Sequence, residues 1–164
     1  MDKEYFENCV KLYEKTVFHI AVNYCKSYHD AEDITQEVFL RFYKKIEHSP
    51  NVEQAKFLLI RMAVNISINH TKSAWKTKVI QSDDDELLDK LYKGSTADSK
   101  RSAEVLSAVR ELPVKYRSVV YLYYYENMQI GEISRVLNIK ETTIQTQLYR
   151  AREILRKKLG EVPE

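Results

Sequence analysis

The sequence is poor in the residues that interrupt helices and in those that bind metals. Its 164 residues include only three glycines, three prolines and two cysteines. So few glycines and prolines argue against a turn-rich or disordered chain. Hydrophobic residues at 44% and charged residues at 30% are instead typical of a folded, helix-rich protein. Cys9 and Cys25 have no metal-ligand partners at suitable spacing, so we expect reduced, half-buried thiols and no metal site.

Long hydrophobic runs are also missing. No apolar stretch approaches the roughly 18–20 residues of a membrane-spanning helix, which predicts no insertion into a membrane. Residues 1–5 contain acids and no apolar core, unlike a signal peptide, so we expect a cytoplasmic protein. The four histidines and scattered carboxylates form no nucleophile–base pair. The sequence therefore predicts no catalytic residue, no enzyme activity, no cofactor and no small-molecule substrate.

The charge is nearly balanced overall but unevenly distributed. The net charge is +2, yet residues 54–78 hold five basic residues and no acid. Residues 135–158 hold seven basic residues against two acids, whereas residues 30–53 hold six acids against three bases. Two basic stretches are typical of contacts with phosphate, and the acidic stretch needs a different partner. Ordinary solvated faces are the alternative interpretation.

Apolar residues recur at three- and four-residue steps through most of the chain, which predicts amphipathic helices. In the first half we expect helices over residues 5–28, 31–46 and 53–73, with Asp30 as N-cap of the second and Asp33 at the capping-box distance. Residues 78–101 are polar and rich in Ser, Thr and Asp, which indicates a flexible linker. We therefore predict an all-α fold with two small helical domains.

The C-terminal domain carries the most specific pattern. A helix begins near Pro113, where a missing N–H costs little, and a short helix follows over QIGEISRVLN. Asn138 can adopt the left-handed conformation that a tight turn requires. A longer helix then reaches about Lys158. Its expected buried stripe consists of Ile144, Leu148, Ala151 and Leu155. A short helix, a tight turn and a longer helix together predict a helix-turn-helix.

The opposite side of that longer helix is polar. Amides, hydroxyls, an aromatic ring and arginines suit base edges and phosphates in a major groove. The candidate DNA-binding residues are Thr142, Thr143, Gln145, Thr146, Gln147, Tyr149, Arg150 and Arg152. Of these, Arg152 suits positioning on the DNA backbone. An αα-hairpin with no role in DNA binding is the alternative.

A family resemblance rests on two motifs. The C-terminal DNA-binding domain of bacterial RNA polymerase sigma factors resembles the segment LPVKYRSVVYLYYYENMQIGEISRVLNIKETTIQTQLYRAREILRKKL. The polymerase-binding helix of their N-terminal domain is similar to DAEDITQEVFLRFYKK. The order of the motifs and the short linker resemble the compact extracytoplasmic-function (ECF) class of the sigma-70 family. The resemblance covers residues 5–75 and 102–159, and it implies sigma region 2 over residues 1–77, a linker over 78–101 and sigma region 4 over 102–164.

The resemblance also implies site residues. Those matching the polymerase-binding motif are Asp33, Gln36, Glu37, Phe39 and Arg41. The next helix matches the element that melts the promoter and captures a flipped base, with its pocket loop within residues 46–54. The candidate contacts to that single strand are Arg61, Asn65, Asn69, Lys72 and Lys76. Residues 142–152 would read the upstream promoter element.

The implied function is promoter-specific initiation of transcription. The protein would bind core RNA polymerase and promoter DNA, recognise two promoter elements and melt the downstream one. An anti-sigma factor is the usual partner in the family. Two alternatives remain: a stand-alone helix-turn-helix regulator that replaces no sigma subunit, and an interaction protein with no DNA role. Gln145 and Gln147 stand where the family often has basic residues. Because Gln pairs with adenine and Arg favours guanine, we expect an upstream element less rich in guanine.

Overall fold

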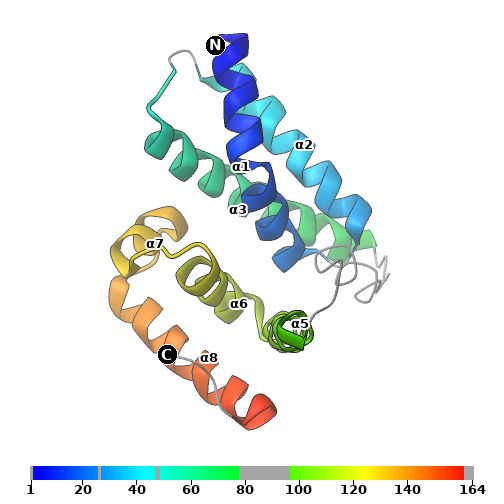
Figure 1. Ribbon diagram of the computed structural model, residues 1–164, viewed down its shortest axis with the longest axis vertical. Coiled ribbons are helices and arrows are strands. Elements are labelled where there is room, and N and C mark those ends of the chain that lie inside the picture. Colours follow the sequence, from blue (N-terminus) through cyan, green and yellow to red (C-terminus); the bar gives the residue numbers. More distant parts are fainter. Residues whose placement is uncertain (1, 26, 47–48, 78–96, 161–164) are drawn as a thin grey trace. The chain divides into compact units, whose positions relative to one another are not determined.

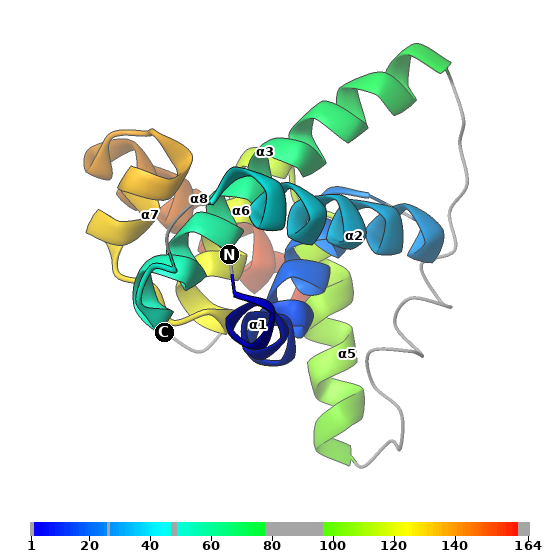
Figure 2. The ribbon, with the colours of Figure 1, turned by 90° about the horizontal axis from the view of Figure 1, so that it is seen from above.

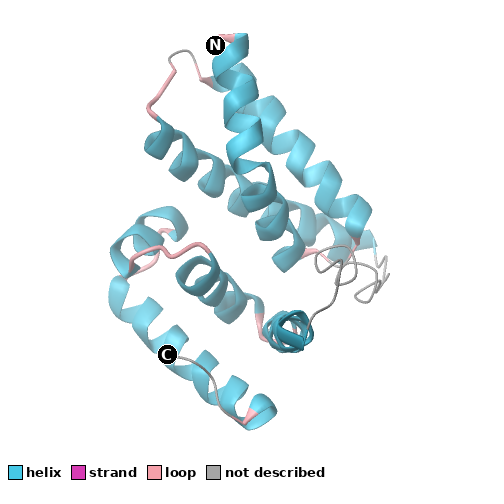
Figure 3. Cartoon of the chain, viewed as in Figure 1, coloured by secondary structure: helices cyan, strands magenta, loops and turns pink. Residues whose placement is uncertain are grey.

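The structure, a computed structural model, divides the chain into two compact units, residues 1–83 and residues 84–164. It describes residues 2–25, 27–46, 49–77 and 97–160. The regular elements within these ranges are all helices (Figure 1, Figure 3). The predicted all-α fold with two helical domains is thus confirmed. Most of the expected linker lies outside the described residues, and its last five residues belong to a helix that begins at Ala97.

The part of the first unit that the structure describes contains three helices. They are α1 (Lys3–Tyr24), α2 (Tyr28–Lys45) and α3 (Val52–Thr77), and each packs against the other two (Figure 1, Figure 2). The largest fully buried side chains include Ile20 of α1, Phe42 of α2 and Leu59 of α3. Both cysteines are buried too, rather than half-buried as expected. This shared core determines which faces of α2 and α3 remain exposed.

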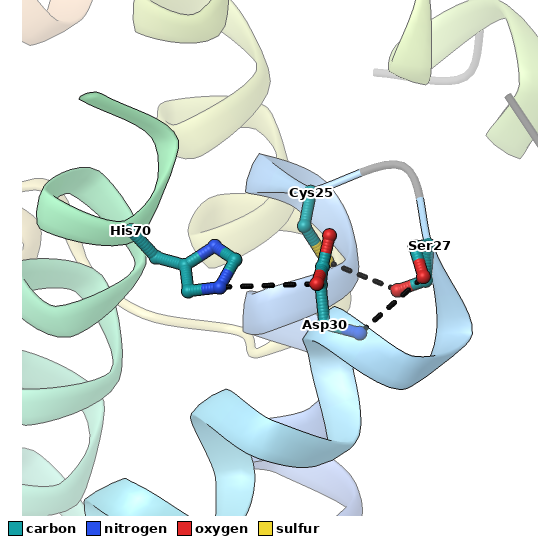
Figure 4. A network of polar contacts seen from close by, with 4 residues as sticks. All are labelled: Cys25, Ser27, Asp30 and His70. Atoms are coloured by element: carbon teal, nitrogen blue, oxygen red, sulfur yellow. Dashed lines mark hydrogen bonds and ion pairs between the residues drawn. The ribbon is translucent and has the colours of Figure 1, made fainter. Parts of the chain in front are cut away.

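The turn between α1 and α2 differs from the prediction. The N-cap of α2 is Ser27, whose hydroxyl accepts a hydrogen bond from the backbone N–H of Asp30 at 3.4 Å (Figure 4). The helix therefore begins three residues before the predicted start, and the assignment of Asp30 as N-cap was wrong. Asp30 instead lies in the first turn, where a carboxylate is favourable. Its Oδ1 is 3.8 Å from Nε2 of His70, which links α2 to α3 (Figure 4).

Within the described residues, the second unit contains four α-helices and one π-helical turn. They are α5 (Ala97–Arg110), α6 (Val114–Val120), the π-turn η1 (Tyr121–Tyr125), α7 (Ile130–Leu137) and α8 (Glu141–Leu159). Helix α8 packs against α5, α6 and α7 (Figure 1). The predicted stripe of α8 is buried as expected. Its members are Ile144, Leu148, Ala151 and Leu155.

The turn between α7 and α8 is held by backbone conformation and by hydrogen bonds. Asn138 has φ 57° and ψ 49°, the left-handed conformation predicted for it. The hydroxyl of Ser134 donates to the carbonyl of Ile139 at 2.5 Å, and the N–H of Ile139 donates back to the carbonyl of Ser134 at 3.2 Å. The helix-turn-helix is thus closed by local interactions, which fixes where α8 begins.

We predict that Asn138→Ala destabilises the second unit by about 1 kcal/mol, because alanine reaches the left-handed region only at a steric cost. Asn138→Gly should be close to neutral, since glycine has no Cβ. Chemical denaturation followed by circular dichroism measures both changes. Asn8→Ala, at an exposed position in α1, is the matched control and should not destabilise. An Asn138→Ala protein as stable as the wild type would contradict the prediction.

Candidate nucleic-acid interface and docking surface

Helix α8 presents most of its predicted DNA-binding residues to solvent. Tyr149 is 59% exposed, and Gln145 and Arg150 are exposed beside it. Thr142, Thr143 and Thr146 are exposed as well, whereas Gln147 is half-buried. The hydroxyl of Thr146 donates to the carbonyl of Thr142 at 3.0 Å, so it is held by its own helix. The result is a polar face of amide, hydroxyl, phenol and guanidinium groups opposite the buried stripe.

A shallow groove of about 280 Å³ lies between α6 and the first turns of α8. Its lining combines hydroxyl, amide and cationic groups and includes no carboxylate: Lys115, Tyr116, Thr142, Thr143, Thr146, Gln147 and Arg150. The ammonium of Lys115 lies 5.1 Å from the centroid of the Tyr116 ring. Such a lining suits an anion. Lys115 and Tyr116 were not predicted as part of this groove, because their distance along the chain from α8 gave no sign that they approach it.

Arg152 lies differently from the other predicted residues of α8. It is half-buried, and its Nε–H donates a hydrogen bond to the hydroxyl of Tyr124 at 2.6 Å. Its guanidinium is 5.6 Å from the ring centroid of Tyr124 and 5.9 Å from that of Tyr123. The structure therefore brings Arg152 against η1, and the exposed polar face of α8 is made by its neighbours.

The predicted polymerase-binding residues of α2 divide between surface and core. Asp33 and Gln36 are exposed, and the carboxylate of Glu37 forms an ion pair with Arg41 at 2.5 Å. Phe39, in contrast, is only 7% exposed and makes an edge-to-face contact with another aromatic ring of the unit, at a centroid distance of 6.4 Å. Phe39 thus packs in the core of the first unit, on the side of α2 that faces α1, whereas its assignment to the polymerase-binding residues stays a prediction.

Two apolar side chains on the exposed side of α2 were not among the predicted polymerase-binding residues. Leu40 is 53% exposed and Tyr43 is 46% exposed. With Asp33 and Gln36 they follow the spacing i, i+3, i+7, i+10, which places all four on one side of a helix. We call these four residues the α2 face. The spacing could have identified them from the sequence, but Leu40 and Tyr43 also fitted the apolar positions of a core helix.

Helix α3 carries the predicted single-strand contacts along one line. Arg61, Asn65 and Asn69 are all exposed and follow one another at steps of four. Residues at that spacing lie on the same side of a helix. Lys72 and Lys76 lie further along α3, where the structure describes the backbone but not the side chains. The exposed part thus combines one cation with two amides.

The loop before α3 is tied to α1. The hydroxyl of Tyr5 donates a hydrogen bond to the carbonyl of Pro50 at 2.5 Å. Burial, together with a hydrogen bond to Cys9, raises the pKa of Tyr5 to about 12. Asn51 and Gln54 then exchange two hydrogen bonds at the start of α3, at 2.9 and 3.3 Å. One end of the predicted pocket loop is therefore anchored; residues 47–48 lie outside the described residues.

In the described parts of the chain, no group of three or more His, Cys, Asp or Glu residues is placed to hold a metal ion. Within the same parts, no helix combines the length and the apolar character that crossing a membrane requires.

Family models match both units. Sigma-70 region 2 matches residues 9–77 and Sigma-70 region 4 matches residues 102–155, together about three quarters of the chain. The RNA polymerase sigma factor SigV of Bacillus subtilis is 28% identical, over 90% of this chain and 87% of its own length. The ECF RNA polymerase sigma factor SigW of the same organism is 29% identical, over 98% of this chain and 92% of its own.

Two solved structures share the fold. One is CnrH in complex with the cytosolic domain of CnrY, with a TM-score of 0.69 at 17% identity, covering 97% of this chain and 90% of that one. The other is the sigma factor RpoE in complex with the anti-sigma factor NepR from Bartonella quintana, with a TM-score of 0.63 at 13% identity, covering 96% and 98%.

Two helical units, the second with an exposed helix-turn-helix face, define a DNA-binding protein of transcription. With the matches to both regions, the chain belongs to the sigma-70 family of bacterial RNA polymerase sigma factors, in its ECF class. As a sigma factor it directs promoter-specific initiation of transcription.

The different positions of Phe39 and Leu40 generate a prediction on stability. Phe39→Ala should lower the free energy of unfolding by about 3 kcal/mol, because it leaves a cavity in the core of the first unit. Leu40→Ala should change it by less than about 0.5 kcal/mol, because that side chain is exposed. Urea denaturation of the two variants provides the comparison. Equal losses would show that Phe39 is not a core residue.

Proposed function

We propose that the two units divide the work of the sigma factor. Residues 1–77 act as region 2, which holds core polymerase and opens the downstream promoter element. Residues 102–164 act as region 4, which reads the upstream element, and residues 78–101 link the two. The observation that carries this proposal is the polar exposed face of α8 on a helix-turn-helix, since amides and guanidinium groups recognise base edges in a major groove.

The α2 face is the proposed docking surface for core polymerase. Leu40 and Tyr43 supply exposed apolar area, and Asp33 lies on the same side of the helix. An apolar centre with acidic neighbours suits a basic partner, because the apolar side chains provide affinity and the carboxylates provide orientation. The ion pair between Glu37 and Arg41 adds a polar rim next to them.

The line of residues on α3 is the proposed contact to the melted strand. Asn65 and Asn69 can hydrogen-bond to an unstacked base, while Arg61 and the lysines that follow can track its phosphates. The hydrogen bond between Tyr5 and Pro50 supports this by holding one end of the adjoining loop. Preferential binding of single-stranded DNA separates the strands. No covalent step is needed, so we propose a factor without enzymatic activity or cofactor.

We further propose that an anti-sigma factor binds this protein. RpoE of Bartonella quintana, which shares the fold, was solved with the anti-sigma factor NepR. An exposed apolar α2 face and an exposed polar α8 face are surfaces that such a partner could cover. Because core polymerase is the proposed partner of the active protein, we propose that the protein acts in the cytoplasm.

Reconstituted transcription with core polymerase tests the proposal. We expect promoter-specific transcripts that require the protein, and we expect Leu40→Arg to weaken its binding to core polymerase at least about ten-fold, since it buries an unpaired charge at the docking surface. Leu12→Arg on α1 is the matched control. Leu12 is similarly exposed, at 58%, and its replacement should leave binding unchanged within about two-fold.

Two outcomes would contradict the proposal. Equal binding of both variants to core polymerase would show that the α2 face is not part of the polymerase interface. Retardation of duplex DNA by the protein alone, with no polymerase-dependent transcripts, would instead favour a stand-alone helix-turn-helix regulator.

The exposed amide of Gln145 generates a prediction on promoter sequence. The wild-type holoenzyme should select an adenine beneath Gln145, and Gln145→Arg should shift the preference at that position toward guanine by about ten-fold or more. Selection of bound sequences from a randomised promoter library measures the shift. The other positions of the selected element should not change. A guanine-centred motif for the wild type would refute the assignment of Gln145.

A further inference from the structure

The contact between Arg152 and the tyrosines of η1 joins two segments of the helix-turn-helix unit that are far apart in the chain. It consists of the hydrogen bond to the Tyr124 hydroxyl and of the placement of the guanidinium over both rings. The planar guanidinium suits such a site, because it can donate a directed hydrogen bond and stack on aromatic rings at the same time. Tyr123 and Tyr124 are half-buried and meet edge-to-face, with centroids 5.0 Å apart. We call this arrangement the Arg152 contact.

The π-helical turn helps to present these rings. The N–H of Glu126 bonds to the carbonyl of Tyr121, five residues back, which is the widened spacing of a π-turn. The same turn stacks Tyr121 on Tyr125, with centroids 5.4 Å apart and planes 15° apart. Tyr123 and Tyr124, whose rings receive Arg152, lie within this widened turn.

Arg152 lies on the same side of α8 as two of the base-reading candidates. At about 100° per residue, its direction from the helix axis is only about 20° from that of Gln145 and about 60° from that of Tyr149. The buried stripe holds α8 against its neighbours through apolar contacts, which have little directional preference. A directed hydrogen bond beside that stripe resists rotation of α8 about its own axis.

We propose that Arg152 is a positioning residue that sets the rotation of α8, so that Gln145 and Tyr149 meet the base edges of the upstream element. The proposal rests on the proposed function of α8. Base recognition requires this control because a binding group must be held within about 10–20° of its productive direction. Arg152 thus contributes to specificity without touching DNA, in place of the phosphate contact suggested by its charge.

The experiment compares Arg152→Gln, Arg152→Lys, Tyr124→Phe and the Arg152→Gln/Tyr124→Phe double variant, each as the full chain bound to core polymerase. Arg150→Gln, on the exposed face of the same helix, is the matched control. Two quantities are measured on the element selected by the wild type and on one altered beneath Gln145. They are the ratio of the two affinities and the dependence of affinity on salt.

A positioning role predicts a specific pattern. Arg152→Gln should lower the affinity ratio by about ten-fold and leave the salt dependence unchanged, whereas Arg150→Gln should reduce the salt slope by about one. Arg152→Lys should not restore the ratio, because an ammonium cannot reproduce the directed guanidinium contact. Tyr124→Phe should lower the ratio by about three-fold. The double variant should lower the affinity ratio no further than Arg152→Gln alone, since the two single changes remove the same interaction.

Three results would overturn the inference. Arg152 would contact a phosphate if Arg152→Gln reduced the salt slope by about one and Tyr124→Phe left the affinity ratio unchanged. Full rescue by lysine would show that positive charge alone suffices. An unchanged ratio with only a lower unfolding midpoint would leave Arg152 a purely structural residue. If the wild-type holoenzyme selects no upstream element at all, the proposed function itself fails and the inference fails with it.

Discussion

The burial of the apolar stripe of α8 is the constraint on which the proposed DNA-reading surface depends. Leu148 and Leu155 are covered by the rest of the second unit, and burial of a side chain of this kind contributes about 1.5–3 kcal/mol. Because a helix is a rigid cylinder, fixing one side also fixes the other. The exposure of Gln145 and Tyr149 is therefore a consequence of what α8 buries.

The same constraint operates in the first unit. Phe42 and Ile34 of α2 are buried against the neighbouring helices, which turns Asp33 and Leu40 toward solvent. The core of this small helical unit thus determines which side of α2 is available for the proposed docking surface. Phe39 lies close enough to the buried side of α2 to pack on α1.

Polar contacts restrict the rotation and the starting point of helices, which apolar burial leaves loosely determined. Apolar packing limits the rotation of a helix only loosely, whereas hydrogen bonds have preferred directions. The left-handed Asn138 and the hydrogen bond between Ser134 and Ile139 define where α8 begins, and the Arg152 contact lies just past the middle of α8. In the first unit, Ser27 caps α2 and Tyr5 holds the loop before α3. Each of these contacts lies beside a surface with a proposed function.

Local chemistry allowed much of this protein to be predicted from its sequence alone. Helical periodicity, the buried stripe of α8 and the left-handed turn at Asn138 depend on residues a few positions apart, so the sequence determined them. The tertiary structure decided the rest. Whether Phe39 is buried, whether Arg152 faces η1 and whether Lys115 reaches the groove beside α8 each depend on a partner far along the chain. The N-cap of α2 is Ser27 and not Asp30, because α1 ends at Tyr24 and α2 begins earlier than its apolar pattern predicted. Local patterns specify which side of a helix is apolar, but only packing specifies which neighbour meets each side chain.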